Sequence, residues 1–116
     1  MRRPLALLTV AATAAAAAVA VPALAATKTV KVGDNWFVRT SGVPTVTVKK
    51  NDRVKWNWVG NRPHNVKVKS GPVKFTSKTM ESGSYSRKMT RAGTYVIYCT
   101  IHGQSDQSMK LRVTSK

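Results

Sequence analysis

Apolar and polar residues alternate along most of the chain from Thr27 onward, and this two-residue period constrains the fold more than any other feature. Apolar residues take every second position in the segments 30–32, 46–48, 54–58, 66–68, 95–99 and 109–113. Such alternation is typical of strands that bury one face and expose the other. Turn-forming glycine, proline, asparagine and aspartate separate the segments. The pattern predicts an all-β, antiparallel sandwich or barrel of about seven or eight short strands.

The N-terminal segment lacks this alternation. Two arginines precede an apolar, alanine-rich run over residues 5–20, and a small-x-small triplet ends at Ala25. Residues 1–25 are therefore predicted to be a secretory signal peptide, cut after Ala25 or Ala26, which leaves 27–116 as a single domain. An uncleaved anchor is the alternative, because the uncharged run is nearly long enough to span a bilayer. We expect an exported bacterial protein, either periplasmic or extracellular, including at the cell surface.

The chain is strongly basic, with 20 lysines and arginines against 4 acidic residues and a net charge of +16. A surface of one sign favours acidic partners, and it also favours contact with an anionic membrane or cell wall. No specific nucleic-acid binding is expected, because the protein is exported and carries no nucleic-acid-binding motif. A solvated basic surface with no specific partner is the simpler alternative, since the lysines alternate with valines along the strands.

The candidate chemistry lies in one cysteine, two histidines and a methionine. Cys99 is the only cysteine, so it cannot form an internal disulfide, and His102 follows it across a short turn. His64 lies far upstream, and Met109 lies seven residues after His102. A lone cysteine is usually a small buried hydrophobe, and a lone histidine is usually a surface residue. Together, however, a thiolate, two imidazoles and a thioether make the ligand set of a type 1 (blue) copper site.

Two short motifs carry a family resemblance. The run GTYVIYCTIH at residues 93–102, together with PHNV at 63–66, resembles the plastocyanin/azurin family of cupredoxins. The resemblance covers essentially the whole domain and implies a cupredoxin-like Greek-key sandwich that binds one copper ion. It implies that His64, Cys99 and His102 are the equatorial ligands. It also implies that Asn65 ties the turn of the first ligand to the cysteine loop, although a plain turn residue is the alternative.

The axial ligand is where the chain departs from the family. The axial methionine of the family usually lies closer behind the second histidine, whereas residues 103–108 intervene here. Met109 is preferred, because it is in phase with the apolar positions of the last strand and should point inward. Glutamine is a known alternative axial ligand, so Gln104 and Gln107 compete with it.

The function expected from these features is one-electron transfer between redox partners by a Cu(I)/Cu(II) site. The basic surface predicts an acidic redox protein as partner, and we expect the carrier to be a monomer. A copper-binding or delivery protein without an electron-transfer partner is the alternative. An enzyme is not expected, because two histidines cannot build a further copper centre. Zinc held by cysteine and histidine would lack a candidate general base.

Overall fold

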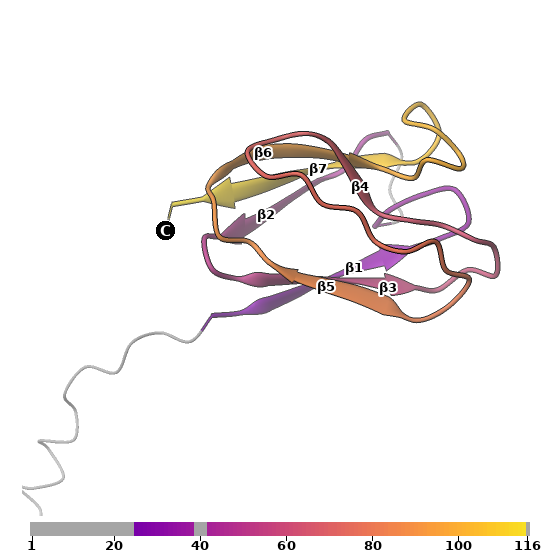
Figure 1. The fold of residues 1–116 in the computed structure, drawn as a ribbon, viewed down its shortest axis with the longest axis horizontal. Helices are drawn as coiled ribbons and strands as arrows, with labels where there is room; N and C mark the ends of the chain where they lie inside the picture. The colour runs from indigo at the N-terminus through magenta and orange to yellow at the C-terminus, as the bar shows by residue number, and fades with distance from the viewer. Residues whose placement is uncertain (1–24, 39–41, 116) are drawn as a thin grey trace, which may run out of the picture.

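A computed structural model describes residues 25–38 and 42–115 of the chain, so nearly all of the predicted signal peptide lies outside the described residues. Within these residues, seven strands form two sheets that face each other across the core (Figure 1). The first sheet has the order β1 (Thr27–Val32), β3 (Arg53–Trp58), β5 (Ser84–Lys88). The second has the order β2 (Thr45–Lys49), β7 (Ser108–Thr114), β6 (Gly93–Tyr98), β4 (Lys67–Ser70). The expected all-β sandwich is confirmed.

Each sheet contains one parallel pair, which the alternation alone does not predict. β1 pairs in parallel with β3, and β2 pairs in parallel with β7, whereas the other pairs are antiparallel. The short turn between β2 and β3 does not make a hairpin, because it carries the chain from one sheet to the other. Asn51 has a positive φ of 77° in this turn, a conformation that asparagine tolerates. Asp52 accepts hydrogen bonds from the backbone N–H groups of Lys49 and Ala26.

The core fills with the residues that the alternation places on the inner faces. Trp56 is completely buried between the sheets and packs near the rings of Phe75 and Tyr85. Tyr95 and Ile97 of β6 and the apolar positions of β7 complete the same cluster. Among the described residues, no helix is long and apolar enough to cross a membrane.

The loops that follow β1, β3 and β6 gather at one end of the sandwich (Figure 1). They comprise residues 33–37, 59–66 and 99–107, and the loop 99–107 joins β6 to β7. Two of these loops contain the candidate ligands, and the third packs beside them through Asp34. The sandwich thus brings residues that are distant in sequence to one place.

Candidate metal centre

Cys99, His64 and His102 converge at the loop end of the sandwich. One potential ligand atom from each lies within 4.8 Å of the others. The Cys99 Sγ lies 3.9 Å from the Nδ1 of His64 and 3.7 Å from the Nδ1 of His102. The two imidazole rings are stacked, with centroids 4.8 Å apart. A sulfur and two ring nitrogens therefore face one small space.

Strand β6 directs Cys99 into this space. Tyr95, Ile97 and Cys99 alternate on the inner face, and all three are fully buried. Just after Cys99 the chain turns, with the N–H of Gly103 donating to the Cys99 carbonyl at 2.9 Å. This turn brings His102 back beside the sulfur and leaves the residue partly exposed.

His64 is fixed on both its backbone and its ring. Its N–H and C=O exchange two backbone hydrogen bonds with Met80, and its side chain is completely buried. The ring Nε2 lies 3.2 Å from the Oδ1 of Asp34. An ionised carboxylate can only accept, so Nε2 carries the proton and donates a hydrogen bond to Asp34. In the neutral imidazole this leaves the Nδ1 lone pair facing the sulfur, which is the form that binds a metal.

Asp34 is a residue of the site that neither of the two sequence motifs contains. Its Oδ1 also accepts the backbone N–H groups of Asn61 and Arg62, at 2.9 and 3.0 Å. The hydrogen bond from His64, followed by that from the N–H of Arg62, lowers the pKa of Asp34 below its ordinary value. The charged carboxylate thus links the loop after β1 to the loop that carries His64. No short motif signals this contact, because the two residues are 30 positions apart.

Asn65 joins the two ligand loops. Its Nδ2 donates to the Oγ1 of Thr100 at 2.8 Å, and its Oδ1 accepts the N–H of Thr100 at 2.8 Å. Asn65 is the neighbour of His64, and Thr100 is the neighbour of Cys99. The pair of bonds therefore sets the spacing between the two ligand loops, which is the link expected for Asn65.

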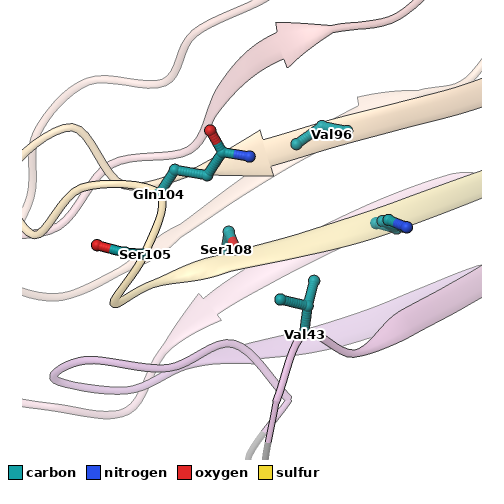
Figure 2. A pocket seen from close by; sticks show the side chains of 6 residues that line it. Val43, Val96, Gln104, Ser105 and Ser108 are labelled. Carbon is teal, nitrogen blue, oxygen red and sulfur yellow. The ribbon is translucent and has the colours of Figure 1, made fainter.

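The three axial candidates lie in different surroundings. Gln104 is exposed and lines a groove on the outer face of the second sheet, together with Val43 and Val96 (Figure 2). Met109 is fully buried on β7, opposite Ile97 of β6. Gln107 is also fully buried, and its Nε2 donates to a backbone carbonyl of the loop after β1. Of the two glutamines, only Gln107 is therefore part of the interior.

Comparison with known proteins agrees with this geometry. A family model described as copper binding proteins, plastocyanin/azurin family, matches residues 25–115. The chain belongs to the plastocyanin/azurin family. Membership agrees with the expectation that this cupredoxin is not an enzyme, since the family consists of small electron carriers.

Solved amicyanin structures resemble the chain over most of its length. An oxidised mutant with lysine in place of a methionine has 27% identity and a TM-score of 0.63, covering 75% of this chain and 81% of that one. A Cu(I) mutant with glutamine in place of the same methionine has 28% identity and a TM-score of 0.62, with the same coverage. A further Cu(I) mutant, with alanine for another methionine, has 27% identity and a TM-score of 0.62, covering 84% of this chain and 88% of that one.

The donor set fits copper. Thiolate and imidazole are borderline-to-soft ligands, and a site with two histidines, one cysteine and a weak axial group is typical of type 1 copper. His64 and Cys99 are excluded from water by the surrounding core, and Met109 is buried in the same core. The cluster is therefore consistent with a type 1 copper site.

Proposed function

We propose that this cupredoxin carries single electrons between redox partners, using one copper ion held by His64, Cys99 and His102. The observation that carries the proposal is the convergence of the Cys99 sulfur with the Nδ1 atoms of both histidines, at 3.9 and 3.7 Å. The copper, when bound, supplies the Cu(I)/Cu(II) couple. The protein supplies the ligand positions and the apolar shell that keeps water away.

The site suits electron transfer because hydrogen bonds from other parts of the protein hold its ligands. Asp34 orients the ring of His64, and the Asn65–Thr100 hydrogen bonds hold the cysteine loop against the histidine loop. Ligands that are fixed in this way cannot rearrange fully toward the geometry that either oxidation state prefers. A small rearrangement favours fast electron transfer.

We propose that electrons enter and leave on the side of His102. His102 is partly exposed, whereas His64 and Cys99 are buried. The neighbouring Ile101 is 51% exposed and places one apolar side chain beside this route. The basic surface would steer an acidic redox protein to the molecule, and that association should weaken as salt is added. Transfer to an acidic partner that is independent of ionic strength would contradict this steering.

A copper-delivery function is the second candidate, and the exposure of His102 favours it. A ligand that reaches solvent offers a path by which copper can leave. Rapid electron self-exchange with slow copper release to a chelator supports the carrier. The opposite pattern supports delivery. Under either function we expect export to the periplasm or cell surface, and N-terminal sequencing of the mature protein tests the cleavage after Ala25 or Ala26.

The visible and EPR spectra of the Cu(II)-loaded protein test the site directly. We expect an intense blue absorption from the thiolate of Cys99, which disappears on reduction. A Cys99→Ser variant should abolish the blue absorption while leaving the sandwich folded, as seen by circular dichroism. A colourless Cu(II) complex of the unaltered protein would contradict the proposal.

A further inference from the structure

Gln107 has a buried carbonyl oxygen with no hydrogen-bond partner. Among the described residues, three buried side-chain polar atoms lack a partner, namely the indole nitrogens of Trp56 and Trp58 and the Oε1 of Gln107. The indole nitrogens are donors, so Oε1 is the acceptor in this group. Buried polar atoms in folded proteins are almost always paired, and an exception calls for an explanation such as an ion.

The hydrogen bonds of the Gln107 side-chain nitrogen determine the orientation of its amide. Nε2 donates to the carbonyl of Gly33 at 2.9 Å and to the carbonyl of Trp36 at 3.0 Å. Both partners are acceptors, so the atom between them must be the nitrogen, and the amide cannot be reversed. With both protons of Nε2 in use, Oε1 is left as the atom available to a ligand.

The register of β6 and β7 places Gln107 opposite Cys99. Tyr98 pairs with Ser108 in the antiparallel ladder, and the N–H of Cys99 continues it by donating to the Gln107 carbonyl at 3.1 Å. Residues directly opposite in an antiparallel pair project their side chains to the same face, with Cβ atoms about 5 Å apart. Cys99 faces the core, so Gln107 shares the face from which the sulfur reaches the candidate site.

Met109, on β7, is the next inward-facing residue after Gln107. It pairs with Ile97, which makes it only a diagonal neighbour of Cys99. Its burial among Leu111 and the other core residues needs no polar partner, because a thioether packs as an apolar group. The register and the unpaired oxygen therefore both favour Gln107 over Met109.

We propose that the Oε1 of Gln107 is the axial copper ligand and that Met109 is a packing residue. The proposal rests on the copper site proposed above. An amide oxygen is a harder donor than a thioether, so it should stabilise Cu(II) relative to Cu(I). This cupredoxin should therefore have a lower reduction potential than it would have with an axial methionine.

The test compares Gln107→Met with Met109→Leu in the copper-loaded protein. Gln107→Met should lower the ratio of Cu(II) affinity to Cu(I) affinity by about tenfold or more. For a one-electron couple, a tenfold fall in this ratio raises the midpoint potential by ~59 mV. Gln107→Met should also change the EPR anisotropy of the Cu(II) form. Met109→Leu should leave the potential and the EPR spectrum essentially unchanged. The reverse pattern would overturn the assignment and return the axial position to Met109.

A measurement on the unaltered protein covers the case in which a variant does not fold. In the diamagnetic Cu(I) form, the side-chain carbonyl ¹³C resonance of Gln107 should shift relative to the metal-free protein, while its amide protons stay protected from exchange. An unchanged carbonyl resonance, with a shifted Met109 methyl resonance, would overturn the proposal. If the unaltered protein forms no blue Cu(II) site, the proposed function fails as well. A blue site with the reverse variant pattern removes only the axial assignment.

Discussion

The two histidines of the candidate site differ in how firmly the protein holds them. His64 is completely buried, bonded through its backbone to Met80 and through its ring to Asp34. His102 is partly exposed and lies in a turn, with its ring against the sulfur of Cys99 and stacked on that of His64. The difference suggests that one imidazole serves as an anchor and the other as the point of access. A carrier needs both, since rigidity speeds the redox step and exposure brings the partner close.

The largest effect should come from deleting each imidazole in turn. His64→Gly and His102→Gly should both abolish the blue absorption of the Cu(II) form. Free imidazole should restore the colour of His102→Gly, because its cavity opens to solvent, and should fail with His64→Gly, because that cavity is closed. Titrating imidazole into each variant while recording the visible spectrum measures the difference. Equal rescue of both variants would remove the distinction between the two histidines.

The next largest effect should come from removing the carboxylate of Asp34, which holds the ring of His64. Asp34→Asn removes the charged acceptor of the Nε2 proton, and loss of such a partner typically lowers metal affinity by about 10–100-fold. Glu81→Gln is the matched control, because it removes the same charge from an exposed acid. Competition with a calibrated copper chelator measures both affinities. Equal affinities for the two variants would show that the Asp34 contact does not orient the ligand.

A smaller effect should come from separating the two ligand loops. Asn65→Ala removes both hydrogen bonds to Thr100 from a largely buried position, which should cost about 1–3 kcal/mol of unfolding free energy. Urea unfolding of the metal-free protein measures this cost, with Asn57→Ala on the outer face of β3 as the control. Asn65→Ala should also broaden the EPR lines of the Cu(II) form. A stability equal to that of the control would contradict the proposed link between the loops.

The smallest effect should come from Asp52, an acid in the turn between β2 and β3. The hydrogen bond from the N–H of Lys49, followed by that from Ala26, lowers the pKa of Asp52 below its ordinary value of 3.8. A carboxyl whose pKa is lower in the folded protein stabilises the fold at any pH above the pKa of the unfolded chain. This stabilisation is lost as the pH falls through the pKa of the folded state. Asp52→Asn should therefore be less stable at neutral pH, with the difference vanishing in acid. Thermal unfolding across this range measures it, and a constant difference would contradict the assignment.

Much of the fold and part of the site can be predicted from local sequence. The alternation of apolar residues places Trp56, Ile97 and Cys99 on inner faces, where the structure has them. The two motifs single out His64, Cys99 and His102, and the structure brings these three together. These features depend on short-range patterns, because successive side chains along a strand point to opposite faces of the sheet.

The remaining features depend on contacts between distant segments. The parallel pairing of β1 with β3 and of β2 with β7 follows from how the sheets assemble, and the strands themselves do not encode it. Asp34 meets His64 only when two loops meet at the end of the sandwich. The proposed preference for Gln107 over Met109 also depends on such contacts, because it rests on a pairing register and on carbonyls 71 and 74 residues away.

By itself, the sequence determined which residues face inward and which donor types the chain can offer a metal. Periodicity and chemical identity are local properties, so they can be read without the fold. Only the tertiary structure decided which carboxylate orients His64 and which buried oxygen is left without a partner opposite Cys99. A hydrogen bond needs its donor and acceptor atoms about 3 Å apart. It can therefore be identified only once the tertiary structure has placed the loops that carry those atoms.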